Sequence, residues 1–256
     1  MDVPTTQVPP PVGGGKHLPG TDGAADVVTR YVTQGLAAIR DIIVLGAFGA
    51  FTGPPGLSKT FVAKTGCELA NVRYRYFETP DKPVGKQLEI ALTLAFMGSV
   101  DRRMTRAELQ EGLREWLKKP GLAVLDEAHR LGLEGVETVR YLASGPENKT
   151  AILFVGHDLG PLLKRHKALE SRIARPLAFK PLSAKEMLVA VKDYHPFFGS
   201  AKEDLLETVQ TEYGKGNFRR WAMLFEAGSK IASQLGVEVL TPKVYRLARA
   251  KLVSLG

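Results

Sequence analysis

Eight consecutive residues combine glycines, a lysine and a threonine at a spacing that suits phosphate binding. They are Gly53, Pro54, Pro55, Gly56, Leu57, Ser58, Lys59 and Thr60, and they separate the apolar run 42–51 from an apolar-periodic segment, 61–69. Such a loop between a strand and a helix surrounds triphosphate oxygens with backbone N–H groups and the positive end of the helix. Lys59 would reach the β- and γ-phosphates, and the Thr60 hydroxyl would bind Mg²⁺. The segment predicts a site for ATP and Mg²⁺; a Pro-Gly turn that happens to precede Lys-Thr is the alternative.

Ser58 departs from the usual pattern of such loops, which has glycine immediately before the lysine. Glycine lets the backbone approach a ligand closely and adopt unusual φ/ψ values, whereas serine carries a Cβ atom. We therefore expect Ser58 to influence nucleotide affinity or the rate of turnover more than binding itself.

Two acids follow a second apolar run, Gly121 to Leu125. The run predicts a buried parallel strand, and ligands of open α/β sheets bind at the carboxyl ends of such strands. Asp126 at this end can hold Mg²⁺, and Glu127 can polarise a water toward the γ-phosphate. Solvated acids at a strand end are the alternative. A position about 65 residues after the glycine loop favours a shared site.

The remaining pattern predicts the elements that position these residues. Residues 1–24 are rich in proline and glycine, and we expect a disordered or flexible arm there. Residues 25–40 have apolar residues at helical spacing. Strand-like runs at 46–52, 72–78, 121–126, 151–156 and 176–180 alternate with helical stretches, which predicts a parallel sheet with helices on both faces. From Ser183 the pattern is helical, with breaks at 194–199 and 214–217 and a helix start at Thr241-Pro242.

The segments GPPGLSKT (53–60) and LAVLDEAHRL (122–131) resemble those of an AAA+ ATPase. This resemblance implies an α/β fold in which residues 25–181 form the P-loop AAA+ nucleotide-binding core, with a parallel sheet flanked by helices. Residues 182–256 would then form the small C-terminal helical lid domain.

Three further segments resemble AAA+ elements that act on the γ-phosphate. His157 follows the run TAILFVG and resembles the sensor-1 position, where Asn or Thr is commoner; a satisfied histidine at a strand end is the alternative. Arg172, after Ser171, resembles the arginine finger that acts on the ATP of a neighbouring subunit. Arg175 could compete for that role, and either arginine could be a surface charge. Arg219, in Gly-Asn-Phe-Arg, resembles the sensor-2 residue that opens a lid helix.

Within AAA+ proteins, the segments DEAHRL (126–131), VGHDLGPLL (155–163) and SRI (171–173) resemble those of the transposition ATPases, the family of phage Mu B, TniB and TnsC and their ExeA-like relatives. The resemblance covers roughly residues 26–235. This resemblance implies an ATP-dependent protein that binds double-stranded DNA as a homo-oligomer, a ring or a spiral filament. It would recruit or activate a transposase and leave the DNA when ATP is hydrolysed. A helicase loader and a nucleotide-switched scaffold with negligible hydrolysis are the alternatives.

The formal net charge of +8 suggests contact with nucleic acid. Arg102, Arg103 and Arg106 cluster between two predicted helices and are our candidates for sequence-independent phosphate contacts. A solvated face is the alternative for each basic cluster. The single cysteine, Cys67, cannot form an internal disulfide, and no apolar stretch approaches the length of a transmembrane helix. We therefore expect a cytoplasmic protein without a membrane partner.

Overall fold

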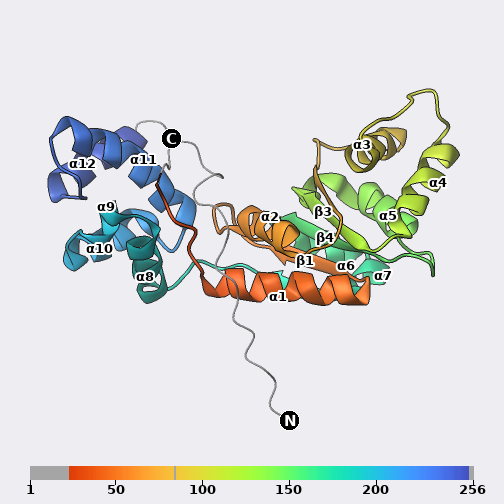
Figure 1. Cartoon of the computed structure of the whole chain (residues 1–256), viewed down its shortest axis with the longest axis horizontal. Helices are drawn as coiled ribbons and strands as arrows, with labels where there is room; N and C mark the ends of the chain where they lie inside the picture. Colours follow the sequence, from red (N-terminus) through yellow and green to blue (C-terminus); the bar gives the residue numbers. More distant parts are fainter. Residues whose placement is uncertain (1–22, 84, 254–256) are drawn as a thin grey trace, which may run out of the picture. The chain divides into compact units, whose positions relative to one another are not determined.

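The computed structural model describes residues 23–83 and 85–253, so the predicted arm lies almost entirely outside the described residues. The described chain forms two compact units (Figure 1). The sheet unit comprises Gln34–Pro55 and Lys59–Phe179. The helical unit comprises the described residues of Met1–Thr33, Gly56–Ser58 and Lys180–Gly256.

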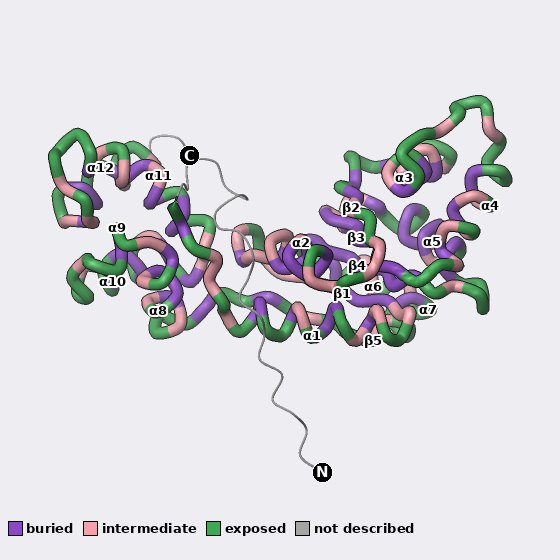
Figure 2. The backbone as a smooth tube through the Cα atoms, viewed as in Figure 1, coloured by how far each residue is buried: buried purple, intermediate pink, exposed green. Residues whose placement is uncertain are grey.

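Five parallel strands form the centre of the sheet unit, in the order β2-β3-β4-β1-β5. Their bounds are β1 (Phe48–Thr52), β2 (Tyr74–Glu78), β3 (Gly121–Asp126), β4 (Thr150–Gly156) and β5 (Ile173–Ala178). Every residue of β3 and β4 is buried, as expected for central strands covered on both faces (Figure 2). The predicted α/β fold with a parallel sheet is confirmed, with the largest difference in strand bounds at β5.

Helices flank this sheet and supply most of its core. They are α2 (Lys59–Leu69), α3 (Lys86–Met97), α4 (Arg106–Leu117), the 3₁₀ turn η1 (Ala128–Leu131), α5 (Gly132–Leu142), α6 (Leu159–Arg165) and α7 (Lys167–Glu170). The core includes Phe48 and Phe154, whose rings stack with centroids 6.1 Å apart. Cys67 is a free, buried core residue, and burial raises the pKa of its thiol to about 12.

Helix α1 (Arg30–Leu45) begins and ends five residues later than the predicted helix 25–40. The first half of the apolar run 42–51 therefore belongs to a helix and not to a strand. Ile39 and Ile42, three positions apart, are both buried, whereas Val44 is 79% exposed. Gly46, with φ of 57°, follows the end of the helix. An apolar run without clear periodicity does not distinguish strand from helix, and burial of one helical face decided the outcome.

The helical unit contains α8 (Ala184–Tyr194), α9 (Pro196–Gly199), α10 (Glu203–Val209), the π-helical turn η2 (Gln210–Gly214), α11 (Phe218–Gln234) and α12 (Pro242–Val253). The predicted break at 194–199 is wrong in part, because His195 Nδ1 accepts the Phe197 N–H at 3.0 Å and Pro196 opens the short helix α9. The predicted start of α12 is confirmed, since Thr241 Oγ1 accepts the Val244 N–H at 3.3 Å. Within the part of the chain that the structure describes, no helix is long and apolar enough to cross a membrane.

Candidate nucleotide-binding site

The glycine loop connects β1 to α2, as its sequence predicts. Lys59 Nζ donates to the carbonyl oxygens of Gly53 at 2.6 Å and of Pro54 at 2.8 Å, and the lysine is only 8% exposed. A buried ammonium group requires such partners. Gly53 has φ of 141°, and a Cβ atom there would lie 2.3 Å from the Phe179 carbonyl oxygen. The loop therefore holds a buried positive charge on a backbone that requires glycine.

Ser58 adopts a left-handed backbone conformation, with φ of 66°. Glycine occupies this region without steric cost, whereas an L-residue pays about 1–2 kcal/mol for it. The serine therefore takes up the conformation that the usual glycine would have, with local strain.

Asp126 joins the acid strand to the helix that follows the loop. Thr60 Oγ1 donates to Asp126 Oδ2 at 2.9 Å, although the two residues are 66 positions apart. The Glu127 N–H donates to Asp126 Oδ1 at 2.8 Å, and the Tyr76 hydroxyl donates to Asp126 Oδ2. The carboxylate is 5% exposed. The structure thus brings together the two residues predicted to bind Mg²⁺ and adds a third, Tyr76, that the sequence did not indicate.

The oxygen atoms of Thr60 and Asp126 fit Mg²⁺, which is usually bound by one or two carboxylates together with substrate phosphates and water. Among residues 23–83 and 85–253, no cluster of three or more His, Cys, Asp or Glu side chains could hold a metal ion by itself. A cation beside Asp126 would therefore take its other ligands from phosphate and water, as in P-loop proteins.

Glu127 follows β3 in a left-handed conformation, with φ of 52°. Its Oε2 atom lies 3.4 Å from Nδ1 of His129, and the His129 ring stacks on His157 with centroids 3.9 Å apart. Nδ1 of His129 is buried, and no described residue forms a hydrogen bond with it. Asp158, directly after His157, also has a positive φ, 44°. Backbone strain of this kind clusters at functional sites. The structure places Glu127 near a ring nitrogen of His129 and His157 against the face of the same ring.

His129 lies beside two of the predicted site residues, Glu127 and His157, although the sequence did not indicate it as a candidate. Burial lowers the pKa of His129, the neighbouring His157 ring lowers it further, and Glu127 opposes them. The imidazole is therefore neutral at pH 7 and can accept or donate one hydrogen bond through each nitrogen according to its tautomer. Only its position, three residues after Asp126, could have indicated it.

Arg172 and Arg175 lie at different distances from the amino-terminal edge of the sheet. Ile173 pairs with Phe48, the first residue of β1, so Arg172 lies at that edge, whereas the glycine loop follows the opposite, carboxyl edge. A five-residue strand separates the edges by roughly 16 Å. Arg175 Nε donates to Asp41 Oδ2 at 2.7 Å. Arg172 is exposed, and Arg175 pairs with Gly49, four positions before the glycine loop begins.

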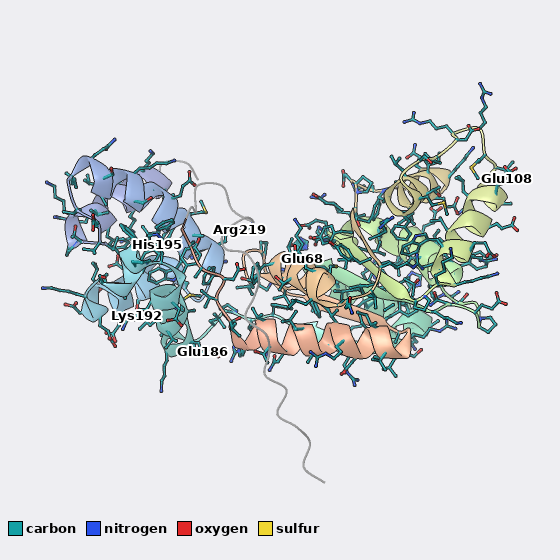
Figure 3. All side chains as sticks on the ribbon, in the orientation of Figure 1. Glu68, Glu108, Glu186, Lys192, His195 and Arg219 are labelled. Carbon is teal, nitrogen blue, oxygen red and sulfur yellow. The ribbon has the colours of Figure 1, made fainter. Side chains whose placement is uncertain are left out.

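Arg219 lies in the first turn of α11, within the helical unit (Figure 3). Asn217 is the N-cap of this helix, as the Gly-Asn pair predicts. The Arg219 N–H donates to the carbonyl oxygen of Gly56 at 3.3 Å, and a Cβ atom on Gly56 would lie 2.3 Å from Asn217 Oδ1. The start of α11 therefore contacts Gly56, and Gly56–Ser58 is the part of the glycine loop that belongs to the helical unit.

The three candidate DNA-binding arginines differ in their surroundings. Arg102 and Arg103 are exposed in the turn between α3 and α4. Arg106 Nε donates to both carboxylate oxygens of Glu89, at 2.8 and 2.9 Å, and Glu89 is fully buried. The Gln110 amide donates to the same carboxylate. Arg106 thus compensates a buried charge that joins the two helices.

Replacing Arg106 with alanine is expected to destabilise the protein by about 2 kcal/mol, because the Glu89 carboxylate loses its charged hydrogen-bond donor. The Arg106 side chain is half-exposed, so the loss of stability should be smaller than for a fully buried ion pair. Urea unfolding measures the effect. Arg102→Ala and Arg103→Ala are matched controls that should change stability by no more than about 0.5 kcal/mol. Equal stability of all three variants would contradict this structural role.

Comparison with known proteins supports the nucleotide-binding fold. Residues 45–160 match a family model described as an AAA domain. The structure is similar to the Orc1 protein of Aeropyrum pernix in complex with DNA, with TM-score 0.66 and 16% identity, covering 89% of this chain and 66% of that chain. It is also similar to Cdc6p from Pyrobaculum aerophilum, with TM-score 0.69, 18% identity, and coverage of 88% and 69%.

A third similar structure is the RuvB Holliday junction branch migration motor of Thermotoga maritima, with TM-score 0.61, 16% identity, and coverage of 88% and 70%. This chain therefore spans about two thirds of the length of these relatives. No curated protein matches the sequence. Identities this low show the fold alone, which is the AAA+ P-loop fold that the motifs predicted.

Proposed function

We propose that this chain binds ATP with Mg²⁺, hydrolyses it in oligomers formed on double-stranded DNA, and recruits or activates a transposase. The contact between Thr60 and Asp126 carries the first part of this proposal. It places the hydroxyl that follows the loop lysine 2.9 Å from the carboxylate that ends β3. This contact supports the proposal that the glycine loop and the acid segment form one site.

The proposed roles follow from the position of each side chain. Lys59 would exchange its loop carbonyls for the β- and γ-phosphates, while Thr60 and Asp126 hold Mg²⁺, which neutralises developing charge on the phosphates. Glu127 orients the attacking water and accepts its proton. His157, at the end of β4, would contact the γ-phosphate as sensor 1. Positioning and charge stabilisation supply most of the rate enhancement in such reactions.

Two arginines would complete the site. Arg219, whose N–H contacts Gly56 of the loop, would act as sensor 2. Arg172 would act on a neighbour's ATP, since it lies at the edge of the sheet opposite the glycine loop. Arg175 is engaged with Asp41, which favours Arg172 for this role. A finger that acts on a neighbour requires an oligomer with head-to-tail interfaces, a ring or a spiral filament.

Double-stranded DNA is the proposed partner because the chain carries a formal net charge of +8. Arg102 and Arg103 are exposed on an ordered turn, where they can contact phosphates without reading sequence. One similar structure is an Orc1 protein in complex with DNA and another is a branch migration motor. The transposase partner rests on the resemblance of residues 26–235 to transposition ATPases alone.

Negligible hydrolysis by a nucleotide-switched scaffold is the second candidate, and the strained conformation of Ser58 favours it. A serine Cβ beside the loop lysine narrows the space for phosphate movement during turnover. ATP binding is common to both candidates.

Binding of a fluorescent ATP analogue tests the site that both candidates share. Lys59→Ala is expected to abolish detectable binding, because the variant removes the one cation of the glycine loop. Lys149→Ala is the matched control and should bind as the wild type does, because Lys149 is exposed and directly precedes β4, at the edge of the sheet opposite the loop. Unchanged affinity in Lys59→Ala would overturn the assignment of this loop.

A further inference from the structure

We infer that Tyr76 is a positioning residue for Asp126 and that its hydroxyl group sets the affinity of the site for Mg²⁺. This inference rests on the proposed ATP site and names a residue outside the loop and the acid segment. Tyr76 lies on β2, in the middle of a strand whose last residue, Glu78, pairs with Asp126.

The Asp126 carboxylate is held at both oxygen atoms. Oδ2 accepts hydrogen bonds from the hydroxyl groups of Thr60, at 2.9 Å, and of Tyr76. Oδ1 accepts the Glu127 N–H at 2.8 Å. The three donors come from α2, β2 and the residue after β3, so the carboxylate cannot rotate without breaking at least one bond. When the Thr60 oxygen binds a cation, Tyr76 and the Glu127 N–H would continue to donate to Asp126, one at each carboxylate oxygen.

The surroundings of Tyr76 hold its hydroxyl in this position. The hydroxyl group of a tyrosine carries its proton at neutral pH, so it is a donor, and here it donates to the Asp126 carboxylate. The ammonium group of Lys64, on α2, lies 5.2 Å from the centre of the Tyr76 ring and favours this ring position.

Orientation of a metal ligand by an outer hydrogen bond has a measurable consequence. Loss of such a partner typically weakens metal affinity by about 10- to 100-fold. A tyrosine that only fills space between β2 and α2 would affect stability and leave Mg²⁺ affinity unchanged. The dependence of nucleotide binding on Mg²⁺ concentration therefore separates the two roles.

The test compares Tyr76→Phe with the wild type by titrating Mg²⁺ against a fluorescent ATP analogue, and by measuring analogue affinity in EDTA. Phenylalanine keeps the ring and its contact with Lys64. We expect the Mg²⁺ concentration at half-saturation to rise by about tenfold or more, with affinity in EDTA unchanged. Unchanged affinity in EDTA also shows that the variant is folded. Tyr74→Phe, on the same face of the same strand and 38% exposed, is the control and should behave as the wild type.

An unchanged or lowered half-saturation concentration in Tyr76→Phe would overturn the inference while leaving the proposed function in place. Wild-type protein that binds no analogue, or binds it without regard to Mg²⁺, would overturn the proposed function and this inference together. Thermal unfolding recorded on the same samples shows any loss of stability, which by itself does not support a role in Mg²⁺ binding.

Discussion

Replacing Glu127 with glutamine is expected to leave ATP bound and to slow its hydrolysis by about 10²–10⁴-fold. Glutamine has the same shape but cannot accept the proton of the attacking water. The change also spares the Mg²⁺ ligands, because residue 127 donates to Asp126 through its backbone N–H, which glutamine retains. The variant should therefore bind ATP as the wild type does but hydrolyse it much more slowly.

Phosphate release and binding of a fluorescent ATP analogue, measured on the same sample, test this expectation. Assemblies on DNA should persist longer in Glu127→Gln than in the wild type. Glu78→Gln is the matched control, since Glu78 ends β2 beside Asp126 and is exposed. Hydrolysis at the wild-type rate in Glu127→Gln would mean that another group orients the water.

Replacing Arg172 with alanine is expected to leave ATP binding intact and to lower hydrolysis by about 10³-fold, the scale of an arginine finger. The reason is geometric, because Arg172 lies at the amino-terminal edge of the sheet and the glycine loop follows the carboxyl edge. The residue would therefore act only across an interface. Arg175→Ala should keep its hydrolysis, because that side chain is bound to Asp41 of its own chain.

Mixing inactive variants tests this interface directly. Arg172→Ala supplies an intact Glu127, and Glu127→Gln supplies an intact Arg172. In a random mixture of equal amounts, about a quarter of head-to-tail interfaces combine both intact residues. Hydrolysis should therefore reappear on mixing. A mixture that remains inactive although both variants bind ATP and form oligomers would contradict the finger role of Arg172.

The strands and the loop were predictable because their signals are local. Buried parallel strands such as β3 appear as continuous apolar runs. The glycine loop follows such a strand directly, and Asp126 ends one. The position of α1 was not predictable in this way, because the run after Asp41 is apolar without a period that separates helix from strand. The same run contributes Val44 to solvent and Ile42 to the core.

Long-range partners were beyond the reach of the sequence. Tyr76 meets Asp126 because β2 and β3 are adjacent in a particular register, and no local pattern specifies that pairing. His129 became visible as a site residue only through its stacking on His157. Arg106 appeared as one of three similar charges, yet its contact with a buried Glu89 gives it a different role. Each of these contacts depends on which helices and strands are neighbours in the folded chain.

The rate of ATP hydrolysis as a function of protein concentration, with and without duplex DNA, tests the central proposal most directly. We predict a specific rate that rises with protein concentration and with DNA of any sequence. The stimulation by DNA should fall steeply as salt is added, because phosphate contacts release counterions. Hydrolysis at a constant specific rate, independent of protein concentration and DNA, would contradict the proposal and indicate a nucleotide switch that acts as a monomer.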